Sequence, residues 1–341
     1  MSENRKSTKE VKIVCLTPVR NEAWVLDKFL KCTSLWADHI IIADQMSTDG
    51  SREIALKYPK VILVENNSET FNEPERQKLL IEEARKIPGK RLLVTLDADE
   101  IFTPNILTSP EWKTMLAADP GTIFKFQMAN FKPDLKNMWL VDHFAWGYMD
   151  DGYHHSSTGK IHTGRIPLPP MNDIVILNQI KVIHLQFTYW ERMQSKHRWY
   201  QAFEIINFPG KSALKIFRMY HHMFGLSKAE IIPVPDEWFS GYSSLGIDIT
   251  SVHTKPMNYF DEQCLEMLEQ YGGGTFKKLN IWDLNWVEKA ELYGKTNFKF
   301  YVDPRSKWDK YIHKYLAKTQ AAHRRLLVRL VDKLIMILFK Y

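Results

Sequence analysis

The sequence is poor in cysteine and has no long apolar run. Its 341 residues include three cysteines, Cys15, Cys32 and Cys264, which are odd in number and far apart. They form neither a disulfide framework nor a zinc-binding pattern, so we expect a reducing, cytoplasmic setting. The polar segment 1–10 lacks the apolar core of a signal peptide. No stretch reaches the roughly 20 apolar residues that a transmembrane helix needs.

The sequence also lacks a large excess of basic over acidic residues. The net charge is +6, and no basic tract is interleaved with stacking aromatics, so the sequence predicts no nucleic-acid partner. Hydrophobic residues make up 45% and charged residues 25%, which is typical of a globular protein. The length fits one large domain, or a domain with a substantial extension.

What the sequence does contain is an apolar run that ends in three carboxylates. The run RLLVTLDADE over residues 91–100 predicts a buried strand followed by Asp97, Asp99 and Glu100. Asp97 and Asp99 are two residues apart, so in an extended chain they point to one face. Two such carboxylates repel unless a cation lies between them, and Mg²⁺ or Mn²⁺ is the natural partner. A solvated acidic turn is the alternative interpretation.

Strands and helices alternate through the first part of the chain. Apolar runs predict strands over residues 11–16, 39–43, 61–65, 91–96 and 122–128. Helices are expected between the first four, with Asn21 as the N-cap of the first helix and Asn72 as the N-cap of the third. This alternation predicts an α/β fold with a parallel sheet.

Polar residues gather directly after three of these strands, over residues 17–22, 44–49 and 97–100. The carboxyl ends of parallel strands meet at one edge of a sheet, and that edge is where α/β proteins bind ligands. We therefore expect the three segments to form one site.

Three motifs carry a resemblance to a known family. TPVRNE at residues 17–22, DQMSTDGS at residues 44–51 and LDADE at residues 96–100 look like the successive signatures of family 2 glycosyltransferases. The resemblance covers residues 11–103 and thins afterwards. It implies the GT-A fold, a Rossmann-like and mostly parallel sheet flanked by helices. It also implies transfer of a sugar from a nucleotide-sugar donor to an acceptor hydroxyl, usually with inversion.

The resemblance assigns roles to particular residues. It implies a nucleotide pocket lined by Thr17 and Glu22, with Asp44 near the base or ribose, Arg76 near the nucleotide, Asp97 near the ribose and metal, and Asp99 on the metal. Gln45 stands where many members have an acid that contacts uracil, so UDP is not implied. Arg76 has an alternative role in pairing with Glu73 or Glu75 on its own helix, and Asp49 is equally suited to cap a helix.

The catalytic base is expected in the polar and aromatic region over residues 139–155. An inverting transfer needs a carboxylate that removes the proton of the acceptor hydroxyl. Asp150 and Asp151 are the candidates, with Asp151 preferred because Gly152 follows it. A surface turn is the alternative for both. Glu100 or Asp142 would be the next carboxylates to test.

A late histidine and a basic helix follow. Strands are expected over residues 174–177 and 180–184, and the resemblance makes His184 a further metal or diphosphate ligand. A hydrogen-bonded structural histidine is the alternative. A helix over residues 189–207 contains Lys196, His197 and Arg198, which fit either a diphosphate contact or a solvated helix face.

The chain ends in an amphipathic helix. One face contains Leu327, Leu330, Val331, Leu334, Ile337 and Leu338, with Arg324, Arg325, Arg329 and Lys333 elsewhere. Such a helix can lie on an anionic membrane, or it can pack against the catalytic domain or a second subunit.

These observations predict three segments. Residues 1–10 form a tail, residues 11–223 a GT-A domain with a nucleotide-sugar half (11–128) and an acceptor half (129–223), and residues 224–341 a mainly helical extension. The predicted activity is metal-dependent, inverting sugar transfer to a glycan or glycolipid acceptor. The setting would be surface polysaccharide, lipopolysaccharide or other envelope glycan synthesis, in the cytoplasm or at the inner face of the membrane.

Two other functions fit parts of the sequence. One is a non-catalytic protein that binds sugar nucleotides and keeps the fold. The other is a phosphatase with an Asp-x-Asp nucleophile pair. Such pairs typically follow the first strand of their fold, whereas Asp97 follows the fourth predicted strand.

Overall fold

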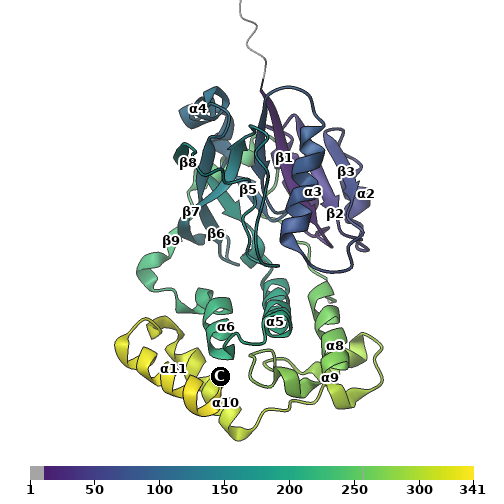
Figure 1. Ribbon diagram of the computed structural model, residues 1–341, viewed down its shortest axis with the longest axis vertical. Coiled ribbons are helices and arrows are strands. Elements are labelled where there is room, and N and C mark those ends of the chain that lie inside the picture. Colours follow the sequence, from purple (N-terminus) through teal and green to yellow (C-terminus); the bar gives the residue numbers. More distant parts are fainter. Residues whose placement is uncertain (1–10, 256) are drawn as a thin grey trace, which may run out of the picture. The chain divides into compact units, whose positions relative to one another are not determined.

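The structure is a computed structural model that describes residues 11–255 and 257–341, so the predicted tail lies outside the described residues. Figure 1 shows the course of the chain. The strands are β1 (Lys12–Val19), β2 (His39–Asp44), β3 (Val61–Glu65), β4 (Arg91–Thr95), β5 (Glu100–Phe102), β6 (Ile123–Phe131), β7 (Asn137–Met149), β8 (Ile174–His184) and β9 (Ile232–Pro233). The helices are α1 (Leu26–Thr33), α2 (Ser51–Ala55), α3 (Glu73–Arg85), α4 (Pro110–Ala117), α5 (Trp190–Asn207), α6 (Ala213–Tyr220), α7 (Asp236–Ser243), α8 (Tyr259–Tyr271), α9 (Trp286–Leu292), α10 (Lys307–Thr319) and α11 (Leu326–Phe339).

The chain divides into two compact units. The first holds the residues up to Thr188 together with Ile232–Thr254, and the second holds Tyr189–Ile231 and Lys255–Tyr341. The structure therefore divides the chain earlier than the predicted boundary at residue 223. The reason is that α5 packs against α8, and α6 packs against α10. The first unit contains the sheet, and the second is helical.

The sheet of the first unit has the strand order β3-β2-β1-β4-β7-β6-β8-β5, and β9 pairs with the start of β7. The pairings of β1 with β2 and β4, of β2 with β3, and of β6 with β8 are parallel. The pairings of β7 with β4 and β6, and of β5 with β8, are antiparallel. Six of the eight strands on this path therefore run in one direction. This arrangement confirms the predicted α/β class and the mostly parallel sheet.

The central strands are apolar because helices cover them. Val14, Leu16 and Leu93 form one buried cluster with Leu80 and Ala84 of α3. Strands buried in this way read as continuous apolar runs, which is why sequence patterns located β1 to β4 correctly. The cap of α3 is also as predicted, since the Asn72 side chain accepts a hydrogen bond from the backbone N–H of Glu75.

Two local predictions were wrong. Asn21 does not cap α1, which begins at Leu26; its φ is 57°, and its Oδ1 accepts from the backbone N–H of Thr48. The two strands expected over residues 174–184 are the single strand β8. Its register against β6 shifts in the middle, where the Glu111 carboxylate accepts from the backbone N–H groups of residues 178–180.

The sheet curls, and this curl assembles the site. Only residues 96–99 separate β4 from β5, yet β5 pairs with β8 at the far end of the strand order. Glu100 of β5 lies opposite His184 of β8, and the backbone N–H of Leu185 donates to the Asp99 carbonyl at 2.7 Å. The acids that follow β4 therefore lie beside the carboxyl end of β8.

Among residues 11–255 and 257–341, no helix combines the length and the apolarity that crossing a bilayer requires.

Candidate active site

The loops after β1 and β2 are tied together at the carboxyl edge of the sheet. The Asp49 carboxylate accepts from the backbone N–H groups of Ala23 and Ser51, and the Ser51 hydroxyl accepts from the backbone N–H of Glu22. Asp49 therefore connects the two loops. It is not the N-cap of α2, which is Gly50. Thr17 is fully buried at the end of β1.

Asp44 and Glu22 lie in these loops with part of their polar capacity already used. Asp44 is 1% exposed, and its Oδ2 accepts from Arg52 Nη1 at 2.9 Å. Among the described residues, Asp44 Oδ1 has no hydrogen-bond partner although it is buried. Glu22 Oε2 accepts from the Trp24 indole at 2.7 Å. The Gln45 amide donates to the backbone carbonyls of Ser68 and Thr70, in the loop after β3, so both of these hydrogen bonds are made within the protein.

Arg165 lies among the acids that follow β4. Its guanidinium donates to Asp97 Oδ2 at 2.8 Å and to Glu100 Oε2 at 2.6 Å, and it stacks over the Trp146 ring at 5.1 Å. Glu100 is 1% exposed, and burial raises its pKa although Arg165 opposes that shift. Asp97 keeps 32% of its side chain exposed. Arg165 thus pairs with two of the three acids, and the exposed part of Asp97 stays accessible to a ligand.

The third acid, Asp99, faces His184. Asp99 is 2% exposed, and its Oδ2 lies 3.7 Å from His184 Nε2. The other ring nitrogen, Nδ1, is 2.7 Å from Oδ1 of the buried Asn130. With that oxygen as acceptor, Nδ1 carries the proton, so in the neutral imidazole the lone pair of Nε2 points toward the carboxylate. Metal-binding histidines are commonly oriented by such a second hydrogen bond.

This donor set fits a divalent cation. A carboxylate oxygen and an imidazole lone pair that face each other are ligands for Mn²⁺, whose remaining positions a diphosphate can fill. In the described part of the chain, no group of three or more His, Cys, Asp or Glu side chains is arranged to enclose a metal. A site with few protein ligands and a substrate phosphate is therefore the one that these residues fit.

Arg76 lies in the first turn of α3, where sequence analysis expected it to approach the nucleotide. Its guanidinium stacks over the Phe71 ring at 5.3 Å, and its Nε is buried without a hydrogen-bond partner among the described residues. Glu73, the alternative partner, instead accepts from the Thr163 backbone N–H and hydroxyl. The phosphate role of Arg76 stays a prediction.

The structure does not bring the two predicted bases to this edge. Because β7 is antiparallel to β4, Met149 lies opposite Leu92, and the N–H of Asp150 bonds the carbonyl of Arg91. Asp150 and Asp151 therefore lie beside the amino end of β4. The acids Asp97, Asp99 and Glu100 follow the carboxyl end of β4, at the opposite edge of the sheet.

Asp150 has a structural role at that edge. Its side chain is fully buried and accepts from the guanidinium groups of Arg85 and Arg91. Burial alone would raise the pKa of Asp150, but the two arginines lower it below its ordinary value. Asp151 accepts from the Tyr148 hydroxyl and from the backbone N–H of Tyr153. Both carboxylates therefore stabilise the loop that follows β7.

We expect Asp150→Asn to reduce stability and to leave the activity per folded molecule unchanged. The change leaves two partly buried arginines without their shared anion, which costs roughly 2–4 kcal/mol of the free energy of unfolding. Denaturant titration measures the loss. Asp173→Asn, the same chemical change at an exposed position, is the matched control. A variant with parental stability but a large loss of turnover would restore Asp150 as the base.

Sequence reasoning missed Arg165, Asn130 and Trp146. Arg165 and Asp97 are 68 residues apart, and the loop before Arg165 has no periodicity that would place it. That loop runs beside α3 from its end to its start, since Arg85 bonds the Tyr153 carbonyl and the N–H of Glu73 bonds the Lys160 carbonyl. This path returns the chain to the site.

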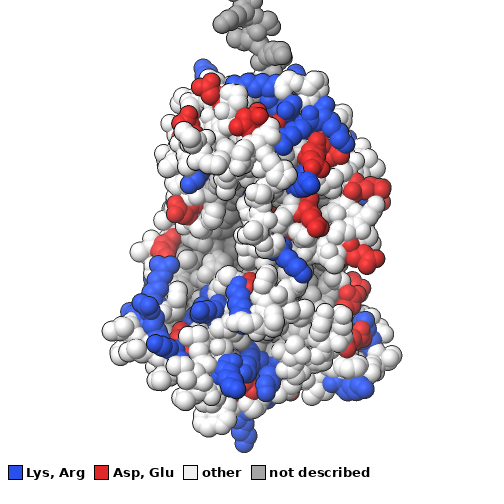
Figure 2. Space-filling model, viewed as in Figure 1, with Lys and Arg blue, Asp and Glu red and all other residues white. Residues whose placement is uncertain are grey.

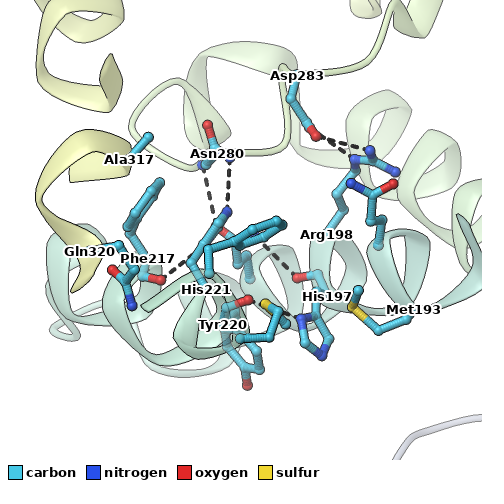
Figure 3. Close-up of a pocket in the computed structure, with 14 residues that line it drawn as sticks. Met193, His197, Arg198, Phe217, Tyr220, His221, Asn280, Asp283, Ala317 and Gln320 are labelled. Carbon is cyan, nitrogen blue, oxygen red and sulfur yellow. Dashed lines mark hydrogen bonds and ion pairs between the residues drawn. The ribbon is translucent and has the colours of Figure 1, made fainter. Parts of the chain in front are cut away.

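The helical unit contains a separate cavity of about 280 Å³ between α5, α6, α10 and the segment around residues 280–283. Figure 3 shows Arg198 directed at Asp283 and His221 directed at Asn280. Arg198 binds Asp283 through two hydrogen bonds of 2.9 Å, and the buried His197 ring bonds the Tyr220 carbonyl. The predicted solvated helix face is therefore wrong for His197 and Arg198. We assign the cavity no catalytic role, because its lining groups are bonded to one another.

The histidines of this cavity predict a loss of stability in acid. Burial lowers the pKa of His221 to about 4 and that of His197 well below its ordinary value. Between about pH 6.5 and pH 4 the unfolded chain then binds more protons than the folded one, so the free energy of unfolding falls as pH falls. The expected slope is up to about 1.4 kcal/mol per pH unit for each histidine.

Urea titration at about pH 7 and about pH 5 tests this dependence. His221→Gln should flatten the slope, whatever its effect on stability at neutral pH. His154→Gln changes an exposed histidine and should leave the slope as it is. Equal slopes in all three proteins would contradict the assignment.

The fold and the site together define a class of protein. A mostly parallel sheet with acids at its carboxyl edge belongs to the α/β proteins that bind ligands at that edge. Within this class, residues 15–163 match the family model for glycosyl transferase family 2. This segment, which includes most of β1, all of β2 to β7 and most of the site, is similar to the family 2 glycosyltransferases. The match confirms the family that the three sequence motifs indicated.

Several solved structures are similar to parts of the chain. Glucosyl-3-phosphoglycerate synthase from Mycobacterium tuberculosis, in complex with Mn²⁺, UDP and glucosyl-3-phosphoglycerate, is 18% identical and aligns with 35% of this chain and 44% of its own, with a TM-score of 0.27. Mannosyl-3-phosphoglycerate synthase from Rubrobacter xylanophilus is 18% identical over 36% and 41%, also with a TM-score of 0.27. HddC from Yersinia pseudotuberculosis is 10% identical over 52% and 93%, with a TM-score of 0.29.

The chain thus spans less than half the length of the two synthases. Sequence identities and TM-scores this low do not support a conclusion about the activity of this protein. A comparison with curated proteins finds no match.

Proposed function

We propose that this protein is a metal-dependent, inverting glycosyltransferase that moves a sugar from a nucleotide donor to an acceptor hydroxyl. The observation that supports the proposal is the meeting of Asp97, Asp99 and His184 at the carboxyl edge of the sheet, beside the loops after β1 and β2. The acceptor would be a glycan or glycolipid in surface polysaccharide, lipopolysaccharide or other envelope glycan synthesis, at the cytoplasmic face of the membrane.

The donor would lie over the ends of β1, β2 and β4. Thr17, Glu22 and Asp44 would line the base and ribose, with Asp97 near the ribose and Arg76 near the phosphates. The buried Asp44 Oδ1 needs a donor group, and a ribose hydroxyl or a base N–H would supply one. Because the Gln45 amide is bound to the protein backbone, the contact that many relatives make with uracil is not offered here.

Asp99 and His184 would hold the divalent cation, with Asp97 close to it. When bound, a cation supplies charge stabilisation for the leaving diphosphate. The protein's own part is orientation: Asn130 directs the His184 ring, and Arg165 offsets the charge of Asp97 and Glu100.

Asp142 takes the place of the two aspartates as the proposed base. Trp146, Phe144 and Asp142 are at alternate positions of β7 and so lie on one face of the strand, and the Trp146 ring stacks with both Phe144 and Arg165. Asp142 keeps 92% of its side chain exposed, and bonds from His143 lower its pKa, so it is ionised at neutral pH. It is therefore an accessible carboxylate on the face that carries Arg165.

A thermal-shift screen of nucleoside diphosphates and nucleotide sugars, with and without Mn²⁺, tests the proposal. A ligand that binds only the folded protein raises its melting temperature, and here the rise should require the metal. Release of the nucleoside diphosphate in the presence of acceptor then tests transfer. Metal-dependent binding without release would favour a non-catalytic sugar-nucleotide protein, and phosphate release from simple esters would favour the phosphatase.

A further inference from the structure

The last helix of the chain turns its apolar side toward solvent. Seven side chains of α11 are between 40% and 77% exposed: Leu326, Leu327, Leu330, Val331, Leu334, Ile337 and Leu338. We call these seven residues the apolar arc. A surface helix of a globular protein normally buries its apolar stripe and exposes its polar side. Here the order is reversed, so the arc requires a partner that covers apolar surface.

The orientation of α11 is set from within the helical unit. Asp332, on the inner side of the helix, is 7% exposed and accepts from Arg218 Nη2 at 2.9 Å. Tyr341, just after the helix, is 3% exposed, and its hydroxyl donates to Asp309 at 2.8 Å. Rotating the arc inward would break the ion pair of Asp332 and expose Ile335, which is 9% exposed. The outward arc is therefore part of the folded state.

Two aromatic side chains extend this surface. Trp308 and Tyr311 of α10 are 66% and 65% exposed, and the Trp308 ring lies 6.0 Å from the Phe339 ring at the end of α11. Amphipathic rings of this kind are enriched where membrane proteins meet the lipid headgroups.

The charge around the arc is positive. Residues 305–341 hold ten Lys and Arg residues against two acids, a net charge of +8 in a chain whose total is +6. Both acids, Asp309 and Asp332, are buried. The exposed side-chain charges of α10 and α11 are therefore all positive, and Arg329 and Lys333 flank the arc. In Figure 2, Lys and Arg side chains border uncharged surface at the lower left, where Figure 1 places these helices.

We propose that α10 and α11 dock this protein on an anionic lipid bilayer. The apolar arc would enter the boundary between headgroups and acyl chains, with the basic residues against the lipid phosphates. With 14 residues, α11 is about 21 Å long, shorter than the roughly 30 Å hydrocarbon core, so it lies on the membrane and does not cross it. A second copy of the chain fits less well, because a two-fold contact through this face would bring two strongly positive surfaces together. The proposal does not depend on the proposed sugar transfer.

Co-sedimentation of the full chain with lipid vesicles tests the proposal. The protein should bind vesicles that contain phosphatidylglycerol, bind pure phosphatidylcholine vesicles less, and lose part of the anionic binding at high salt. The double variant Leu327→Asp and Leu334→Asp should weaken binding at least about tenfold, since it places charge in the apolar boundary. Both positions are exposed, so folding should be unaffected. Leu56→Asp with Leu245→Asp, at exposed leucines elsewhere, is the matched control and should bind as the parent does.

A second pair of changes separates the two parts of the surface. Arg329→Gln with Lys333→Gln should remove part of the preference for anionic vesicles and keep the weaker binding to neutral ones. The proposal is overturned if the full chain ignores anionic vesicles at low salt, or if the two leucine pairs bind equally. It is also overturned if sedimentation shows a dimer that Leu327→Asp and Leu334→Asp convert to a monomer, because the arc then covers a second copy.

Discussion

Asp99→Asn should abolish metal-dependent donor binding and transfer while leaving the fold intact. The asparagine has nearly the same shape but no charge, so the cation loses its carboxylate ligand. Charge stabilisation by a metal is worth several kcal/mol, so turnover should fall by roughly 10²–10³-fold or more. Stability should change little, because Asp99 is buried and a neutral amide of the same shape is less costly to bury than a carboxylate.

Two measurements check this result. Isothermal titration with donor, with and without Mn²⁺, should show that the metal no longer strengthens binding in the variant. The melting temperature of the unliganded protein should match that of the parent and of Asp173→Asn. Undiminished, metal-dependent activity in Asp99→Asn would remove the central claim about the site.

Asp142→Asn should reduce turnover without reducing donor binding. The pKa of the acceptor hydroxyl is far above neutral, so attack on the sugar requires a positioned base that removes its proton. Such a base contributes about 10²–10⁴-fold, and replacement by an amide should cost that factor. The side chain is exposed and faces away from the core, so neither stability nor the melting-temperature shift caused by donor and metal should change.

Comparison of kcat with donor KM in the Asp142 variant separates this role from a binding role. Asp134→Asn, an aspartate between β6 and β7 whose bonds are local, is the control. If Asp142→Asn transfers sugar at the parental rate, another carboxylate is the base. Glu100 would then be the next to test, although its bonds to Arg165 and its burial favour a supporting role.

Local sequence pattern was enough for the first sheet strands and for the position of the acids after β4. Apolar runs closed by polar residues located β1 to β4, and parallel strands must bring their carboxyl ends to one edge. Asp97 and Asp99 are attached directly to such an end, so their position followed from the pattern alone. His184 ends a strand as predicted, but its role as a metal ligand came from the family resemblance and stays a proposal.

The two predicted bases lie away from the acids after β4 for a topological reason. Asp150 and Asp151 also end a strand, but β7 runs opposite to β4, and its end lies at the other edge. A residue pattern shows where a strand ends without showing its direction in the sheet. Asp142, which sequence analysis ranked behind them, lies in the middle of β7, and we now prefer it because its neighbours on that face reach Arg165.

By itself the sequence determined the α/β class, the similarity to a family, the acids after β4 and the amphipathic character of the last helix. Each of these depends on residues close in the chain, where periodicity and spacing carry the information. The tertiary structure decided the rest: the return of Arg165 to Asp97, the joining of α5 and α6 to the helical unit, and the outward direction of the apolar arc. These depend on contacts between distant segments, such as Asp332 with Arg218, which no local pattern contains.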